Sequence, residues 1–254
     1  MIEHPQVIEP ELLRKYMERF VGFGSPSASI WFVGLEQGGG KDLKELDRRL
    51  SAWANQGSGA FADLREYCKS IDERRWHGES PRIQPTLGKL ACVALALEGR
   101  EPNTESVRRF QADSLGQNGG STLIAELMPL PSRNLRQWIY ANLEMPELET
   151  RDAYQANFVQ KRTCLLRETI RQTAPRAVVF LGLLKVKTWQ DIAGVVFKEP
   201  GAGGALWASH GPTDFVVIRH PTAFGSKNAD FDEVGRALRA LGPSAEPQTS
   251  IGRA

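Results

Sequence analysis

The stretch Ile30–Gly40, which reads IWFVGLEQGGG, decides the fold. Its first four residues are apolar and do not alternate with polar ones. A short apolar run of this kind predicts a strand that is buried on both faces, as in a parallel sheet. The glycines that follow allow the backbone to approach a ligand closely. The stretch therefore predicts a buried strand that runs directly into a candidate binding loop, Gly34–Gly40.

Three further apolar runs, each bounded by turn residues, have the same character: Leu123–Met128, Ala177–Leu181 and Phe215–Ile218. Helical patterns separate these strands. Apolar residues trace one helix face from Tyr154 to Ile170, and similar stripes run from Leu12 to Phe20 and from Phe231 to Leu241. Helices that alternate with buried strands predict a three-layer α/β/α fold with a central four-stranded parallel sheet. In such sheets ligands bind beyond the carboxyl ends of the strands.

The bulk properties fit one α/β domain. We assign residues 1–241 to that domain, and residues 242–254, which are small, polar and rich in proline and glycine, to a flexible tail. The N-terminus lacks the apolar core of a secretory signal, and no apolar run approaches the ~20 residues of a membrane span. We therefore expect a cytoplasmic monomer, nucleoid-associated if bacterial, with no membrane partner.

Composition leaves the partner open. The net charge of +2 neither demands nor forbids DNA. The three cysteines form no Cys-x-x-Cys pair, and the four histidines form no helical metal motif. We therefore expect no metal and no cofactor.

The first loop matches neither of two familiar nucleotide-binding motifs. Gly34 is followed by three residues other than glycine, which excludes the dinucleotide pattern G-x-G-x-x-G. Gly40 and Lys41 are followed by Asp42, whereas a phosphate-binding P-loop requires Ser or Thr there. The alternative is a flexible strand-to-helix turn that carries a solvated acid, Glu36.

The last predicted strand runs into Arg219–Asn228, which begins Arg-His-Pro-Thr. His220 is fixed by the following proline at the carboxyl end of a strand, which is a suitable place for a catalytic imidazole. A His-Pro pair is also common turn chemistry, so a structural role is the alternative. A catalytic role for His220 is favoured only when it is considered together with a partner in the first loop.

Taken together, the two loops resemble those of the uracil-DNA glycosylase superfamily, which pairs a Gly-rich loop after the first strand with a His-Pro-Ser-like loop after the last. Leu181-Gly182 resembles the end of its penultimate strand, and Pro129–Asn134 resembles the loop after its second strand. The likeness covers the order and spacing of four strands, from Ile30 to Leu241.

This resemblance implies roles for individual residues. Glu36, at the third position of the loop, would position and deprotonate water, and His220 would donate a hydrogen bond to the departing base. The implied base-binding residues are Gly34, Gln37, Gly38 and Glu126. The implied DNA contacts are Thr222, Phe224, Ser226 and Lys227, with Phe224 as a wedge in the stack. An apolar cap on the core is the alternative for Phe224.

Departures from the superfamily pattern concern the choice of base. Gln37 replaces the usual proline, and Thr222 replaces the usual serine. Glu126 stands where an asparagine often binds uracil, and an ionised carboxylate can accept from N3–H but cannot donate to O4. Either Glu126 is protonated, or another group reads O4, or the base is not uracil. An ion pair of Glu126 with Arg133 or Arg136 is the structural alternative.

The sequence thus predicts a monofunctional DNA glycosylase that flips out uracil, or a related deaminated base, and hydrolyses its N-glycosidic bond. Its partner would be uracil-containing DNA, single- or double-stranded. Two other classes remain open: a non-catalytic single-strand or nucleotide-binding protein with the same fold, and a hydrolase of free modified nucleosides.

Overall fold

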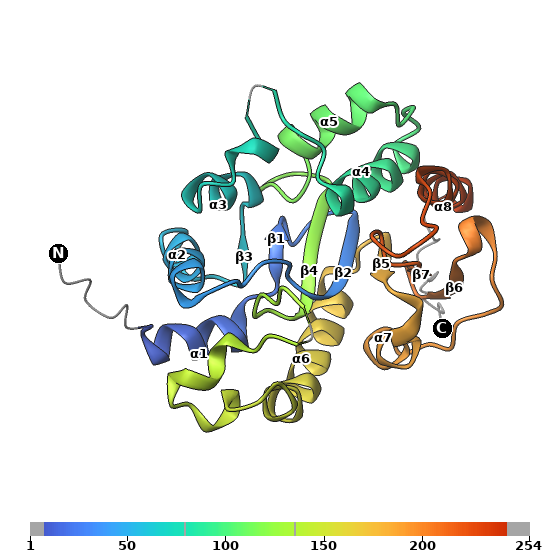
Figure 1. The fold of residues 1–254 in the computed structure, drawn as a ribbon. Coiled ribbons are helices and arrows are strands. Elements are labelled where there is room, and N and C mark those ends of the chain that lie inside the picture. The colour runs from blue at the N-terminus through green and yellow to red at the C-terminus, as the bar shows by residue number, and fades with distance from the viewer. Residues whose placement is uncertain (1–7, 79, 135, 243–254) are drawn as a thin grey trace, which may run out of the picture.

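A computed structural model describes residues 8–78, 80–134 and 136–242. The described chain is an α/β structure built on one sheet of seven strands, in the order β3-β1-β4-β2-β5-β7-β6 (Figure 1). The strands are β1 (Gly22–Gly24), β2 (Ile30–Glu36), β3 (Phe61–Ala62), β4 (Thr122–Met128), β5 (Ala177–Leu181), β6 (Leu206–His210) and β7 (Thr213–Ile218).

The four strands predicted from the sequence are β2, β4, β5 and β7. They are adjacent and mutually parallel, in the order β4-β2-β5-β7. The expectation of a sheet of only four parallel strands is wrong, because three further strands make the sheet mixed. β1 is antiparallel to β4, β3 is parallel to β1, and β6 is antiparallel to β7.

The additional strands lack a buried apolar run for physical reasons. β1 is the tripeptide Gly22-Phe23-Gly24, and β3 has only two residues. β6 lies at the edge of the sheet, where Ser209 and His210 are exposed. Short strands and edge strands do not need the continuous apolar sequence that a strand covered on both faces requires.

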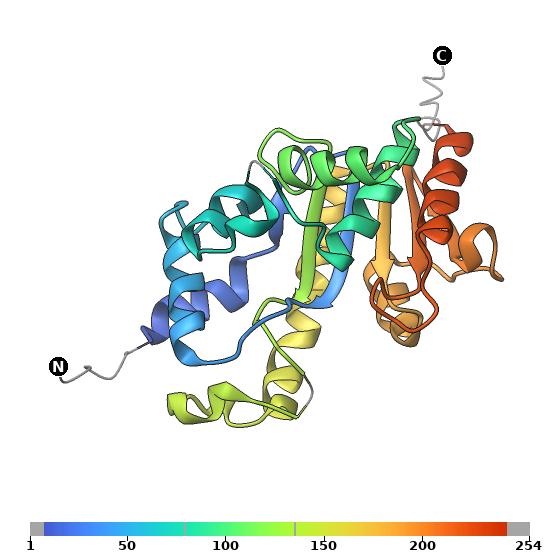
Figure 2. The same cartoon turned by 45° about the horizontal axis from the view of Figure 1, so that its top comes forward.

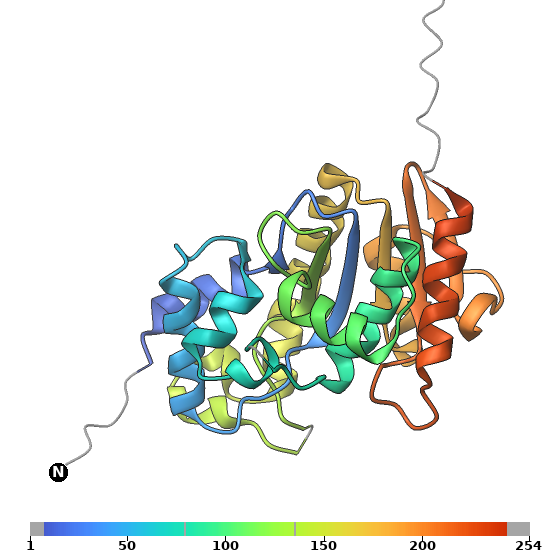
Figure 3. The ribbon, with the colours of Figure 1, turned by 90° about the horizontal axis from the view of Figure 1, so that it is seen from above.

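Helices lie on both faces of the sheet, with α4, α5 and α8 on one face and α6 and α7 on the other (Figures 1 and 3). Helices α1, α2 and α3 gather beside the β3–β1 end (Figure 2). Their bounds are α1 (Pro10–Arg19), α2 (Leu43–Ala54), α3 (Leu64–Ser70), α4 (Pro85–Leu97), α5 (Thr104–Asp113), α6 (Arg151–Thr173), α7 (Val186–Ala193) and α8 (Asn228–Leu241).

Three of these helices follow the apolar stripes predicted from the sequence. Tyr154 and Ile170 of α6 are buried, as are Tyr16 of α1 and Phe231 of α8. Leu241, at the end of the last stripe, is 58% exposed instead. Of the predicted tail, residues 243–254 lie outside the described part of the chain.

The parallel strands place the two candidate loops at one edge of the sheet. β2 ends at Glu36 and β7 ends at Ile218, and β5 lies between them. Two strand spacings separate β2 from β7, about 10 Å in a regular sheet. The loops that follow these strands therefore begin within the width of a nucleoside of each other.

Candidate functional site

A cavity of about 660 Å³ opens at this carboxyl edge. Three of the predicted base-binding residues line it, namely Gln37 and Gly38 from the first loop and Glu126 from β4. We call it the Glu126 cavity. Its volume lies within the range of about 300–1,000 Å³ typical of small-molecule sites.

The fourth predicted base-binding residue, Gly34, makes room for Glu126. The two residues are register partners in the parallel pair β2–β4. A Cβ atom on Gly34 would lie 2.3 Å from Oε2 of Glu126, far closer than two such atoms can approach. The Glu126 carboxyl group therefore lies over the bare backbone of Gly34, and the glycine is needed for that contact rather than for an unusual φ angle.

The Oε2 atom of Glu126 is buried and has no hydrogen-bond partner among the described residues. Burial and the negative charge of Glu36 together raise the pKa of this carboxyl group to about 8, although Arg162 opposes the shift. Glu126 is therefore protonated at neutral pH. A protonated carboxyl group has one donor and one acceptor, unlike the acceptor-only carboxylate.

The ion pair considered for Glu126 as an alternative is absent. Neither Arg133 nor Arg136 contacts its carboxyl group in the described structure. The arginine near Glu126 is Arg162 of α6, which is buried and donates to the backbone oxygens of Glu126 and Leu127 at 2.8 Å and 2.9 Å. Arg162 thus fixes the backbone at the end of β4 and leaves the Glu126 side chain unpaired.

The first loop is held by Arg49 and Glu45 of α2. Arg49 donates to the Gly38 oxygen at 3.1 Å and pairs with Glu45 at 2.7 Å. Glu45 in turn accepts from the backbone nitrogens of Gly40 and Lys41, each at 3.0 Å. Burial would raise the pKa of Glu45, but these two hydrogen bonds and the charge of Arg49 outweigh it and lower the pKa to about 2. The loop is therefore anchored, and a flexible turn is not what the structure shows.

Glu36 is not a solvated acid. Both of its carboxylate oxygens accept from Nη1 of Arg151, at 2.8 Å and 3.0 Å, and both side chains are nearly buried. Arg151 also donates to Ser132 Oγ and lies over the ring of Trp138. Glu36 thus connects the end of β2 to the segment after β4, and it is not among the described residues that line the Glu126 cavity.

Tyr67 of α3 is a cavity residue that the sequence analysis missed. Its side chain is only 2% exposed, yet its hydroxyl group has no hydrogen-bond partner in the described structure. No sequence signal distinguishes it from an ordinary core tyrosine on an amphipathic helix. Trp76 and Gln84 also line the cavity, from a polar segment to which the sequence assigned no role.

His220 follows β7 in a defined tautomer. Its Nδ1 accepts from the backbone nitrogen of Thr222 at 3.3 Å, which leaves the ring proton on Nε2. Burial lowers the pKa of the imidazole, and the nearby charge of Lys89 lowers it further. His220 is therefore neutral at pH 7 and has a free Nε2–H donor.

Lys89 of α4 holds the His220 loop in place. Its ammonium group donates to the backbone oxygens of Pro221 and Ser226, at 2.5 Å and 3.0 Å. The Ser226 hydroxyl closes the loop by donating to the His220 oxygen at 2.9 Å. No sequence pattern pointed to this lysine, which lies more than a hundred residues from its partners.

The side chain of Phe224 is fully exposed, so its alternative role as an apolar cap on the core is wrong. Leu184, in the short segment after β5, is equally exposed. Thr222 and Ser226 contact His220, whereas Lys227 directly precedes α8. Two bare apolar side chains therefore follow adjacent strands at the carboxyl edge.

The structure unites only part of the predicted site. Gln37, Gly38 and Glu126 share one cavity, with Gly34 directly beneath Glu126. His220 lies at the same edge but is not among the described lining residues. Helix α4 links the two regions, because Leu87 lines the cavity and Lys89 binds the His220 loop.

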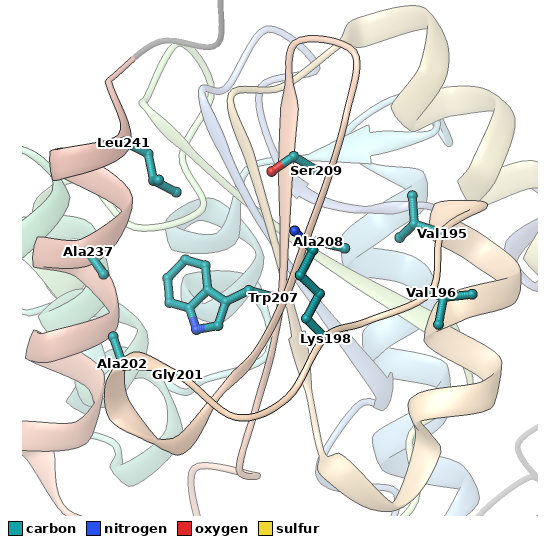
Figure 4. A pocket seen from close by; sticks show the side chains of 10 residues that line it. All are labelled: Val195, Val196, Lys198, Gly201, Ala202, Trp207, Ala208, Ser209, Ala237 and Leu241. Atoms are coloured by element: carbon teal, nitrogen blue, oxygen red, sulfur yellow. The ribbon is translucent and has the colours of Figure 1, made fainter.

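A second cavity, of about 670 Å³, lies against the edge strand β6 (Figure 4). Trp207 points from β6 toward α8, where Ala237 lies, and most of the remaining lining is apolar (Figure 4). The described lining contains no acid and no histidine, and Lys198 is its only charged side chain. Acid–base chemistry is therefore concentrated at the carboxyl edge.

Within the described residues, no group of three or more His, Cys, Asp or Glu side chains is arranged to hold a metal ion. No described helix has the length and apolar character that crossing a membrane requires. Comparison of the sequence with protein-family models and with curated proteins finds no match.

Proposed function

We propose that this protein is an N-glycosidic hydrolase that removes uracil, or a related deaminated base, from DNA and so initiates base excision repair. The observation that carries the proposal is the Glu126 carboxyl group in a cavity at the carboxyl edge, with its Oε2 buried and unpartnered among the described residues and its pKa raised to about 8. It stands where the resemblance implies an asparagine, and it offers a donor and an acceptor side by side, as a carboxamide does.

This pair of hydrogen-bonding groups matches the edge of a lactam. The carbonyl oxygen of Glu126 would accept from N3–H of uracil, and its hydroxyl would donate to O4. The N1–H and O6 of hypoxanthine offer the same pair. An ionised glutamate could not donate a hydrogen bond to O4. The protonated carboxyl group supplies that donor.

His220 would stabilise the departing base. As the glycosidic bond breaks, negative charge develops on the base, and the free Nε2–H of a neutral imidazole would donate to its O2 atom. Because His220 lies outside the cavity lining, the base and sugar would have to lie between the first loop and the His220 loop. The exposed Phe224 would fill the gap that the flipped nucleotide leaves in the stack.

Glu36 would orient the attacking water. Arg151 occupies one side of its carboxylate, and a carboxylate has about four acceptor sites, so acceptor capacity remains for a water molecule. The charge of Glu36 would also favour the sugar cation. A phosphate on the His220 side of the flipped nucleotide would contact Thr222, Ser226 and Lys227.

The test is excision from oligonucleotides that each contain one uracil, hypoxanthine or xanthine, with EDTA present and abasic sites revealed by alkali. We expect cleavage at uracil, retained by Glu126→Asn and lowered by Glu36→Gln. The opposite pattern would make Glu126 the catalytic carboxylate. Binding without excision of any base would instead support the non-catalytic alternative.

A further inference from the structure

The Glu126 cavity is basic although the whole chain is nearly neutral. Five basic side chains line it among the described residues, namely Lys41, Arg48, Arg49, Arg75 and Arg133, against the acids Glu45, Glu73 and Glu126. Since Glu126 is protonated at neutral pH, basic groups exceed charged acids by three. A concave site lined by one sign of charge concentrates a ligand of the opposite sign.

Two of these cations have no partner among the residues that the structure describes. Arg49 pairs with Glu45, and Arg75 pairs with Glu73. The side chains of Arg48 and Arg133 make no ion pair or hydrogen bond with any other described residue, although both line the cavity. They flank the first loop, because Arg48 precedes Arg49, which binds Gly38, and Arg133 follows Ser132, which binds Gln37.

The interior of the same cavity holds unsatisfied polar atoms. The Tyr67 hydroxyl, which has Arg49 and Tyr16 nearby, and Oε2 of Glu126 are both buried without a hydrogen bond of regular geometry in the described structure. Leaving such a group unsatisfied destabilises the empty site, so a ligand that bonds to it regains that energy. The cavity therefore has two orphaned polar groups inside and two unpaired guanidinium groups around its lining.

From this arrangement we propose that the Glu126 cavity binds a complete nucleotide, with its heterocycle against Glu126 and Tyr67 and its phosphate against Arg48 and Arg133. The proposal rests on the proposed function only for the identity of the heterocycle. The phosphate belongs either to a free mononucleotide or to a nucleic-acid strand, and both present the same anion to the two arginines.

The experiment measures binding by isothermal titration calorimetry with three probes: deoxyuridine, dUMP, and a single-stranded oligodeoxynucleotide with one uracil. The variants are Arg48→Ala/Arg133→Ala and Tyr67→Phe. Arg136→Ala is the matched control, because Arg136 is an exposed arginine near Arg133 that does not line the cavity. Arg48 and Arg133 are exposed and unpaired, so their removal should leave the melting temperature nearly unchanged.

We expect dUMP to bind about 10-fold to 100-fold more tightly than deoxyuridine, the range for charge-assisted hydrogen bonds. The double variant should lose that advantage, Tyr67→Phe should weaken both probes alike, and Arg136→Ala should retain wild-type binding. Arginine dependence with the oligonucleotide but not with dUMP would assign the phosphate to a strand.

Equal affinity for dUMP and deoxyuridine, combined with oligonucleotide binding that is indifferent to both arginines, would overturn the inference. The outcome is separable from the proposed function. Uracil excision without an arginine-dependent phosphate contribution would overturn this inference alone. Arginine-dependent nucleotide binding without excision of any base would overturn the proposed function alone.

Discussion

Gly34 and Glu126 face each other across the parallel pair β2–β4, and the carboxyl group of the glutamate occupies the space that a side chain on residue 34 would fill. A backbone glycine thereby creates room for a buried acid at the carboxyl edge of the sheet. Because burial and the charge of Glu36 raise the pKa of this acid to about 8, it is protonated at neutral pH. The hydrogen-bonding character of the cavity follows from this one contact.

Gly34→Ala should displace the Glu126 carboxyl group and lower the free energy of unfolding by roughly 1–2 kcal/mol through overpacking. Urea denaturation measures the change. Gly38→Ala is the matched control, because a Cβ atom there would contact nothing within 4 Å, and it should change stability by less than about 0.5 kcal/mol. In a Glu126→Ala background the cost of Gly34→Ala should vanish, and an unchanged cost would refute the contact.

Stability should depend on pH through Glu126. Its carboxyl group has a pKa of about 8 in the folded protein, against an ordinary value of 4.5. Between these values the folded state retains a proton that the unfolded state has released, so stability falls as pH rises through this window. Glu126→Gln does not titrate. Its stability relative to wild type should therefore rise from about pH 4.5 and level off above about pH 8, by a few kcal/mol in all.

Thermal or urea unfolding of both proteins from pH 5 to pH 9 measures this difference. Parallel stability curves for wild type and Glu126→Gln would show that Glu126 is ionised in the folded protein. The proposed hydrogen bonds of Glu126 to the N–H and carbonyl oxygen of the base would then be refuted.

The pair of Glu36 with Arg151 should be a strong contributor to stability. Their side chains are 12% and 13% exposed, so Arg151→Ala leaves a nearly buried carboxylate without its cation and should cost roughly 3–5 kcal/mol. Arg14→Ala is the control, because Arg14 is 40% exposed in its pairs with Glu11 and Glu147, and it should cost far less stability than Arg151→Ala. Urea denaturation measures both losses of stability. Similar losses for Arg151→Ala and Arg14→Ala would contradict a strong contribution of the Glu36–Arg151 pair.

Removal of the His220 imidazole should act on the chemical step. His220→Ala should lower kcat by about 10²-fold to 10⁴-fold with little change in KM, because the charge that His220 stabilises exists chiefly in the transition state. Thr222→Ala keeps the backbone donor to His220 Nδ1 but removes the hydroxyl that contacts the same atom at 3.0 Å and is proposed to contact a phosphate, so it should raise KM more than it lowers kcat. Steady-state kinetics on a uracil-containing oligonucleotide separate the two effects. A rise in KM alone for His220→Ala would make it a binding residue.

The sequence predicted the middle of the sheet because those strands are covered on both faces. β2, β4, β5 and β7 each carry a mostly apolar run, and such runs can be recognised without knowledge of their partners. The edge strand β6 and the short strands β1 and β3 carry no such constraint. Trp53 was likewise predictable as a core residue from its helix stripe, and it is fully buried.

The site was less predictable because its contacts join distant parts of the chain. Arg151 lies 115 residues from Glu36, and Lys89 lies 132 residues from Pro221. Local patterns do not encode such pairs, so Glu36 looked like a solvated acid. The protonation of Glu126 depends on burial and on a missing partner, which only the folded chain defines. The sequence did identify the two loops and the position of that glutamate.

In the proposed mechanism this protein excises a lactam-bearing base with Glu126 protonated and His220 as the donor. The most direct measurement is alkali-induced cleavage of an oligonucleotide with one uracil, at pH 7 and at pH 9.5, by wild type, His220→Ala and Glu126→Gln. We predict cleavage by wild type that falls at the higher pH, alkaline activity retained by Glu126→Gln, and near loss of activity in His220→Ala. An uncut strand with every protein, or wild-type cleavage by His220→Ala, would contradict the account.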